Sequence, residues 1–167
     1  MRAMLPSPWV SGIAHVASSI ERKAMDGAAI LSDFLALTPV THPGLGENDR
    51  SATGFLPKTE FEATADLFFA RPSESIRGWE RAVDAQARIV SAVRAVVDAA
   101  PAGDVAIVSH GGVGALLLCH LLQTPISRTM DQPAGNGGHV LAFDRQDGTL
   151  RHGWRDICLA DGIHKMA

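Results

Sequence analysis

Residues 105–113, which read Val-Ala-Ile-Val-Ser-His-Gly-Gly-Val, are the stretch that decides the fold. The first four residues are an unbroken apolar run, which is typical of a strand buried in a parallel sheet. The two glycines then lead into the apolar segment from Val113 to Leu122, which we expect to be a helix. The stretch therefore predicts a strand, a glycine turn and a helix in immediate succession.

A second strand and helix are predicted near the start of the chain. Gly12 to Ala17 is short and apolar, which is typical of a buried strand. Ser18 or Ser19 can cap the helix that follows with a side-chain oxygen. Apolar residues then recur at helical spacing, so we expect one face of this helix to pack on the sheet. The residues of that face are Ile20, Ala24, Ala28, Leu31 and Leu35.

Proline and glycine residues interrupt residues 38–58, so we expect this segment to leave the sheet as an irregular excursion. A short helix is predicted around residues 59–69. A longer helix is predicted from about residue 75 to residue 99, because valines recur on one face and Pro101 and Gly103 follow. The excursion is therefore expected to lie above the sheet, before the chain returns to it.

The last predicted elements are residues 139–143 and 149–154, which flank Asp147-Gly148. This dipeptide is a strong signal for a tight turn between antiparallel strands. The order of elements predicts an α/β fold with a mostly parallel sheet flanked by helices on both faces. A length of 167 residues is usual for one domain, so we expect residues 1–167 to form a single domain.

The composition restricts the partners and the location of the chain. A net charge of −3 with evenly mixed signs leaves no basic stripe, so nucleic acid is not expected as a partner. Cys119 and Cys158 have no metal-binding spacing, which favours a reducing compartment, the cytoplasm, over a disulfide framework or a zinc site. No apolar run approaches the roughly 20 residues that span a bilayer, so no membrane interaction is predicted.

Ser109-His110-Gly111-Gly112 is the strongest candidate for a functional site. Ligands of parallel sheets bind beyond the carboxyl ends of the strands, and the motif places an imidazole at such an end. The glycine amides at a helix N-terminus can approach an anion, so a phosphate would fit there. His110 can instead cap the helix or pack in a polar pocket, and the strand-turn-helix context alone does not decide between these interpretations.

Four segments, in this order, resemble the histidine phosphatase superfamily, whose members are phosphoglycerate mutase-like proteins. The strand that ends in Ser109-His110 looks like the one that delivers the family's second active-site histidine. The other three resemble a Ser-Ser-x-x-x-Arg-Ala helix start, a Leu-x-Glu element and a Gly-Glu-Ser stretch. They are Ser18-Ser-Ile-Glu-Arg-Lys-Ala24, Leu45-Gly-Glu47 and Pro72-Ser-Glu-Ser-Ile76.

The resemblance implies phosphomonoester hydrolysis or phosphoryl transfer through a phosphohistidine. The substrate would be a small phosphorylated molecule or a phosphoprotein, and the family needs no metal and no cofactor. His110 would donate a hydrogen bond to the phosphoryl oxygens, the amide of Gly111 would assist, and Glu47 would protonate the leaving oxygen as a general acid. Glu47 is also compatible with a simpler role, as a solvated carboxylate in a loop that contains several others.

The same resemblance predicts the residues that bind phosphate. The family's helix-start arginine aligns with Lys23, and Arg22 lies one residue earlier, so either residue is expected to supply the positive charge, with Ser19 beside it at the strand end. A lysine supplies charge without the bidentate fork of an arginine. Both residues are also compatible with a role as exposed bases in the first turn of a helix.

The chain departs from the family at its start. The family's nucleophilic histidine lies on a strand that ends in Arg-His-Gly, and nothing before Gly12 resembles it. We therefore expect the chain as written to lack that strand and the true start to lie upstream. The alternatives are a catalytically inactive binding or regulatory module, and a homo-oligomer that fills the missing strand position.

One segment has the family's motif as a literal sequence. Arg151-His152-Gly153 lies in the second arm of the predicted hairpin, where no glycine-rich helix start follows. His15 lies inside the first predicted strand and is expected to be a core histidine. Neither residue is therefore expected to be the nucleophile.

Overall fold

The computed structural model describes residues 1–133 and 137–158 of the chain. Its central sheet has three parallel strands in the order β2-β1-β3. These strands are β1 (Ile13–Ser18), β2 (Val40–Thr41) and β3 (Asp104–Val108). Ser18 of β1 is paired with Val108 of β3, so the carboxyl ends of these strands lie side by side. The turns that leave the two strands are therefore neighbours.

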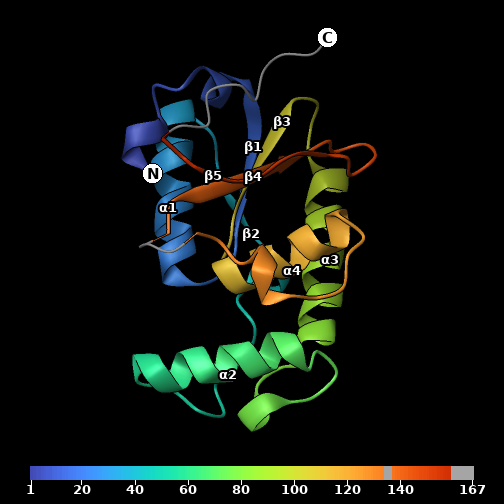
Figure 1. Cartoon of the computed structure of the whole chain (residues 1–167). Coiled ribbons are helices and arrows are strands. Elements are labelled where there is room, and N and C mark those ends of the chain that lie inside the picture. Colours follow the sequence, from blue (N-terminus) through green and yellow to red (C-terminus); the bar gives the residue numbers. More distant parts are fainter. Residues whose placement is uncertain (134–136, 159–167) are drawn as a thin grey trace.

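Helices cover both faces of this sheet (Figure 1). Val16 and Val108 pack in an apolar cluster with the first helix, and Ala17 and Ile107 pack with the third and fourth. Successive side chains of a strand point to opposite faces, which is why two clusters form. The expected α/β fold, with helices on both faces of a parallel sheet, is confirmed. The helices are α1 (Arg22–Leu35), α2 (Lys58–Ala70), α3 (Ala82–Ala99) and α4 (Gly111–Leu121).

The start of α1 differs from the prediction. Its N-cap residue is Glu21 and no side chain caps the helix, so the predicted cap by Ser18 or Ser19 is wrong. The hydroxyl of Ser19 is instead 2.7 Å from a histidine of another turn. Ile20 precedes the helix and is 55% exposed, so it does not belong to the apolar face. The rest of that face packs on the sheet as predicted, with Ala24, Ala28 and Leu31 buried.

The long helix α3 begins later than predicted, at Ala82 rather than near residue 75. A 3-10 turn, Ile76–Gly78, precedes it. Arg77 and Gly78 have φ values of 54° and 83°, which an α-helix does not include. Arginine has no special preference for this left-handed region, so the sequence carries no local signal for the break.

Strands β4 (His139–Phe143) and β5 (Leu150–Asp156) form the predicted antiparallel hairpin. Within residues 1–133 and 137–158, the hairpin is a separate two-stranded sheet and does not extend the parallel one. Figure 1 shows the hairpin crossing in front of the parallel strands. Gly148 in the connecting turn has a φ of 76°, a conformation that favours glycine.

Arg145, in the turn of the hairpin, connects this sheet to the end of α3. Its guanidinium donates hydrogen bonds of 2.7–3.2 Å to the carbonyls of Val97, Ala100, Pro101 and Gly103. Carbonyls at the end of a helix have no partners within the helix, and a cation there also interacts favourably with the helix dipole. Arg145 therefore stabilises the C-terminus of α3 and the position of the hairpin together.

Replacing Arg145 with alanine is expected to lower the free energy of unfolding by about 1–3 kcal/mol, because it leaves these carbonyls without their donors. Urea unfolding measures the change. Arg155 is exposed on β5 of the same hairpin, and Arg155→Ala is the matched control, with an expected effect below about 0.5 kcal/mol. Equal effects of the two substitutions would show that the carbonyl contacts contribute nothing.

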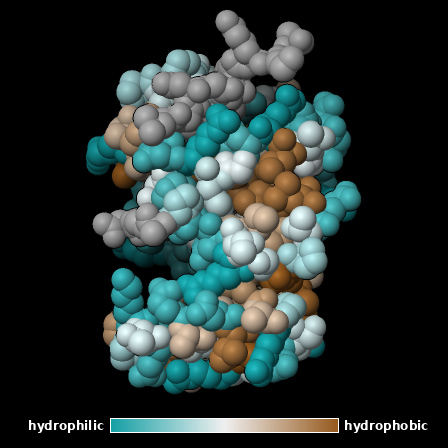
Figure 2. Space-filling model, in the orientation of Figure 1, coloured by the Kyte–Doolittle hydropathy of each residue, from teal (hydrophilic) through white to brown (hydrophobic). Residues whose placement is uncertain are grey.

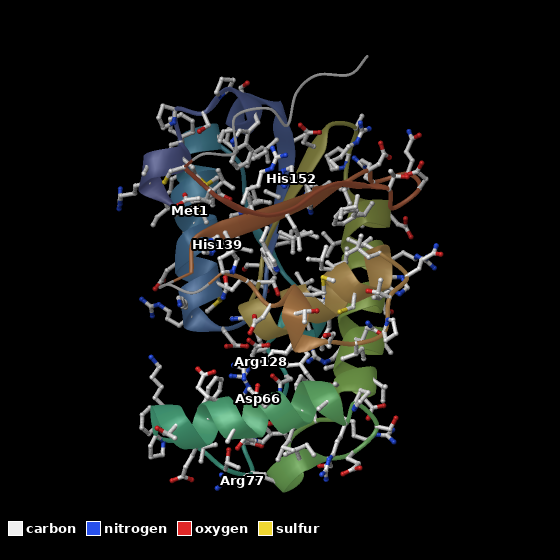
Figure 3. The ribbon with its side chains drawn as sticks, in the orientation of Figure 1. Met1, Asp66, Arg77, Arg128, His139 and His152 are labelled. Atoms are coloured by element: carbon white, nitrogen blue, oxygen red, sulfur yellow. The ribbon has the colours of Figure 1, made fainter. Side chains whose placement is uncertain are left out.

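Helix α2 forms a separate layer beyond the carboxyl ends of the strands (Figure 1). Phe68 of α2 packs against Trp79, with ring centroids 6.1 Å apart. Arg128, in the turn that follows α4, forms ion pairs with Glu62 and Asp66 of α2 (Figure 3). Apolar packing and these ion pairs therefore hold the α2 layer against the rest of the molecule.

The surface is mainly hydrophilic on the face drawn in Figure 2, with apolar areas on the upper body and on the α2 layer. A hollow separates that layer from the upper body on the left of this view. Over residues 1–133 and 137–158, no helix combines the length and the apolar character that crossing a bilayer requires.

Candidate active site

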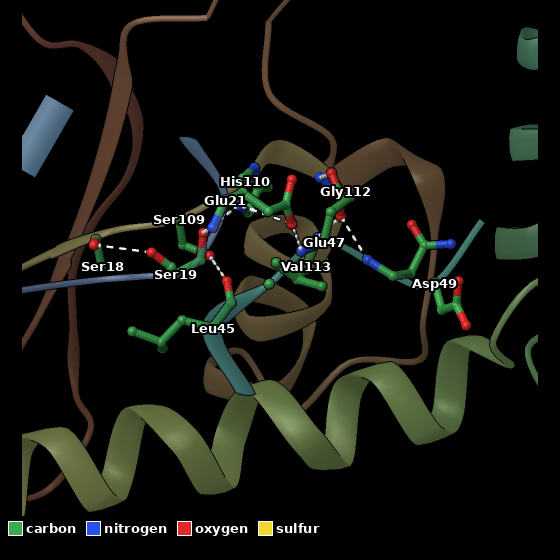
Figure 4. Close-up of polar contacts among 12 residues, drawn as sticks. Ser18, Ser19, Glu21, Leu45, Glu47, Asp49, Ser109, His110, Gly112 and Val113 are labelled. Atoms are coloured by element: carbon green, nitrogen blue, oxygen red, sulfur yellow. Dashed lines mark hydrogen bonds and ion pairs between the residues drawn. The ribbon is translucent and has the colours of Figure 1, made fainter. Parts of the chain in front are cut away.

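His110 lies in the turn between β3 and α4. It is the N-cap residue of α4, but its side chain makes no capping hydrogen bond, so the interpretation of His110 as a helix cap is wrong. The imidazole is 12% exposed, and its Nε2 lies 2.7 Å from Oγ of Ser19 and 3.2 Å from Oε1 of Glu21 (Figure 4). Two polar groups therefore hold the ring at the carboxyl end of the sheet.

Glu21 connects His110 to the excursion. Its Oε1 also accepts a hydrogen bond of 2.8 Å from the backbone N–H of Glu47. Ser109 donates from its hydroxyl to the carbonyl of Leu45 at 2.7 Å, which ties the same segment to the end of β3. Three segments that are far apart in the sequence thus meet at one place. We call the resulting group the strand-end cluster: Ser19, Glu21, Glu47 and His110.

The carboxylate of Glu47 lies against the first turn of α4. Its Oε2 accepts from the N–H of Gly112 at 3.1 Å, and its Oε1 accepts from the N–H of Val113 at 3.0 Å. A Cβ on Gly112 would be 2.7 Å from Oε1 of Glu47, so a glycine is needed for this approach. The carboxylate of Glu47 is therefore fixed at the N-terminus of α4 by two backbone N–H groups, and is not a solvated loop carboxylate.

Arg88 of α3 holds the segment that carries Glu47. Its guanidinium donates to the carbonyls of Gly44, Gly46 and Glu47 at 2.9–3.2 Å. It also makes a bidentate pair with Glu80 at 2.9 and 2.7 Å. The hydrogen bonds that Arg88 donates to Glu80 raise the pKa of Arg88 above its ordinary value, so this side chain is charged at every physiological pH. The position of Glu47 therefore depends on a residue that the sequence analysis did not single out.

The residues predicted to bind phosphate are not all brought together. Ser19 is buried in the cluster, beside the imidazole of His110. Arg22 is 85% exposed and pairs with Asp26 at 2.8 Å on the surface of α1, outside the cluster. The side chain of Lys23 is also exposed in the first turn of α1. The structure thus brings Ser19 together with His110 and Glu47, whereas the side chains of Arg22 and Lys23 are exposed on α1.

Sequence reasoning missed two further residues of the site. Arg50 pairs with Glu47 at 3.2 Å, and its position three residues after Glu47 is the one signal that points to it. The amide of Gln132 lies so close to Gly111 that a Cβ on Gly111 would collide with it. Nothing in the sequence connects Gln132 to the Ser-His-Gly-Gly turn, because the contact depends on how the chain returns after α4.

The other histidines considered from the sequence lie outside the strand-end cluster. His152 is 8% exposed within β5, and its Nδ1 is 2.7 Å from the carbonyl oxygen of its neighbour Gly153. His15 is in the middle of β1, in register with Val105. In the part of the chain that the structure describes, His110 is therefore the histidine of the cluster. Residues 135 and 136 of the glycine-rich stretch 135–138 lie outside the described residues.

Several solved structures share this fold. A mycobacterial glucosyl-3-phosphoglycerate phosphatase in complex with inorganic phosphate is 23% identical, with a TM-score of 0.68, over 92% of this chain and 79% of that chain. YhfR of Bacillus stearothermophilus is 23% identical, with a TM-score of 0.66, over 90% and 78%. The product of the open reading frame Rv3214 of Mycobacterium tuberculosis is 16% identical, with a TM-score of 0.61, over 86% and 72%. At these identities the similarity shows the fold. No curated protein matches the chain.

A sequence model described as the histidine phosphatase superfamily (branch 1) matches residues 9–154. The matched range contains the three parallel strands, all four α-helices and every residue of the strand-end cluster. It agrees with the fold of the solved structures and with the four sequence segments described above. The chain therefore belongs to the histidine phosphatase superfamily.

Proposed function

We propose that the chain is a phosphomonoester-processing member of its superfamily, and that the strand-end cluster binds the phosphoryl group and delivers a proton to the leaving oxygen. The substrate is a small phosphorylated molecule or a phosphoprotein. The observation that carries the proposal is the position of His110, held by Ser19 and Glu21 at the carboxyl end of β3 and next to the first turn of α4.

The chemistry assigns a different task to each group. A phosphoryl oxygen replaces Ser19 and Glu21 as the acceptor from Nε2–H of His110, and the amide of Gly111 adds a second donor at the helix N-terminus. A histidine nitrogen forms a bond to phosphorus as the bond from phosphorus to the ester oxygen breaks, and Glu47 gives that oxygen its proton. Water then attacks the phosphohistidine and releases inorganic phosphate.

A nucleophilic histidine beside His110 is the remaining requirement. In the described part of the chain the strand-end cluster contains His110 alone, so turnover needs a histidine from outside the cluster, such as that of an Arg-His-Gly strand. This observation also supports a second candidate function. A chain with His110 and the amide of Gly111 but without a nucleophile would be a binding or regulatory module for phosphorylated ligands.

Phosphate release from p-nitrophenyl phosphate, together with calorimetric binding of methylphosphonate, tests the proposal on the full chain. Methylphosphonate is expected to bind, because it presents the phosphoryl oxygens and cannot be hydrolysed. Binding with turnover supports the enzyme, and binding without turnover supports the binding module. A folded protein that neither binds methylphosphonate nor releases phosphate would overturn both.

The general-acid role of Glu47 has its own test. Glu47→Gln is expected to lower turnover of glycerol phosphate by about 10²-fold, and turnover of p-nitrophenyl phosphate much less, because nitrophenolate leaves without a proton. Steady-state kinetics with the two esters measure this difference. Glu74→Gln, which replaces a carboxylate paired with Arg71 on the surface, is the control. Equal losses with both esters would assign Glu47 a positioning role.

A further inference from the structure

A pocket of about 380 Å³ lies beside the strand-end cluster, in the excursion between β2 and α3. Its volume is within the range of pockets that hold small molecules. Aromatic and aliphatic side chains make up most of its wall, and two cations lie at its margin. The lining includes Phe55, Leu56, Phe61 and Trp79, with Arg50 and Lys58.

The inner wall of the pocket is held in place by its own contacts. Trp79 is 2% exposed, and its Nε1–H donates to the hydroxyl of Thr53 at 2.9 Å. The ring of Phe61 packs against it, with ring centroids 5.8 Å apart. A wall that is already in place loses little conformational entropy when a ligand binds.

Arg50 contacts both the aromatic rings of the pocket and Glu47, the proposed general acid. Its guanidinium lies over the rings of Phe61 and Trp79, at 4.9 and 5.0 Å from their centroids. The same guanidinium is 3.2 Å from the carboxylate of Glu47. A single side chain thus separates the pocket from the group that would protonate the leaving oxygen. The part of a substrate beyond that oxygen is therefore the part that can reach the pocket.

Phe55 belongs to the lining of the pocket but is exposed to solvent. It is 94% exposed, the most exposed of the large hydrophobic residues in the described chain. Burial of this exposed ring against an apolar group would be favourable. The neighbouring Gly54 has a φ of 59°, and no atom lies within 4 Å of the position of its missing Cβ.

We infer that this pocket binds the apolar part of the leaving alcohol, and that the preferred substrates are phosphomonoesters of aromatic or branched apolar alcohols. Phe55 covers the bound group from the solvent side. The inference rests on the proposed function, because it assigns the pocket to the leaving group of the same reaction. Small polar esters would leave the pocket empty and would bind through the phosphoryl group alone.

Calorimetric titration of the full chain with 1-naphthylphosphonate and with methylphosphonate tests this inference. The two probes share a phosphoryl group and differ in the apolar part. Naphthylphosphonate is expected to bind at least about tenfold more tightly, and Phe55→Ser is expected to reduce this ratio by about five- to tenfold. Phe34→Ser removes a half-exposed phenylalanine on α1 and is expected to keep the ratio.

Each outcome separates the inference from the proposed function. Equal affinities for the two probes, or a preference that Phe55→Ser leaves intact, would overturn the pocket assignment. If methylphosphonate does not bind and His110→Asn leaves naphthylphosphonate binding unchanged, the proposed function fails instead. A ratio that falls with Phe55→Ser and survives Phe34→Ser, together with weaker binding of both probes in His110→Asn, supports both.

Discussion

Replacing His110 with asparagine is expected to weaken methylphosphonate binding by about 10–100-fold, and to lower any turnover of p-nitrophenyl phosphate by about 10²–10⁴-fold. The imidazole supplies a donor at the carboxyl end of β3, where its Nε2 lies 2.7 Å from Oγ of Ser19 and 3.2 Å from Oε1 of Glu21. The shorter amide of asparagine does not reach the same point. Calorimetric titration and phosphate-release kinetics measure the two effects.

The control for this prediction lies on the same helix. His120 is exposed at the other end of α4, and His120→Asn is expected to change neither quantity. The His110 variant loses the contacts of the imidazole with Ser19 and Glu21, so urea unfolding beside the titration checks that the variant is folded. A His110→Asn protein that is folded and keeps full affinity for methylphosphonate would remove His110 from the site.

The second large effect is expected at Arg88. Arg88→Ala removes the donors that hold Gly44, Gly46 and Glu47, and it leaves the carboxylate of Glu80 unpaired in a partly buried place. We expect the free energy of unfolding to fall by about 2–4 kcal/mol. Because the same bonds position Glu47, we also expect turnover of glycerol phosphate to fall. Urea unfolding and steady-state kinetics measure the two effects.

Two further variants show whether the hydrogen bonds of Arg88 cause the expected loss of stability. Arg88→Lys keeps the charge but cannot reproduce the fork of hydrogen bonds, so it is expected to be intermediate in stability. Arg94 lies exposed on the same helix, and Arg94→Ala is expected to cost less than about 0.5 kcal/mol. If Arg88→Ala cost no more than Arg94→Ala, the guanidinium would not be what holds the segment around Glu47.

The contacts of the site differ in how far they can be predicted from the sequence. The proximity of Ser19 and His110 follows from a general rule, because both residues come directly after parallel strands that are neighbours in one sheet. The contact of Glu47 with α4 is different in kind. It depends on the path of an irregular excursion, which Arg88 and the hydroxyl of Ser109 determine from other segments. No local periodicity encodes such a path.

The sequence by itself determined the elements whose signals are local: the unbroken apolar run of residues 105–108, the glycine turn after His110, and the Asp147-Gly148 hairpin. Only the tertiary structure decided where α3 begins, that the hairpin stays apart from the parallel strands, and that Glu21, Arg50 and Gln132 belong to the site. The physical reason is that strands and helices arise from hydrogen bonds and burial repeated along the chain, whereas a site is made of single contacts between residues far apart in the sequence. Such contacts depend on the packing of the whole molecule.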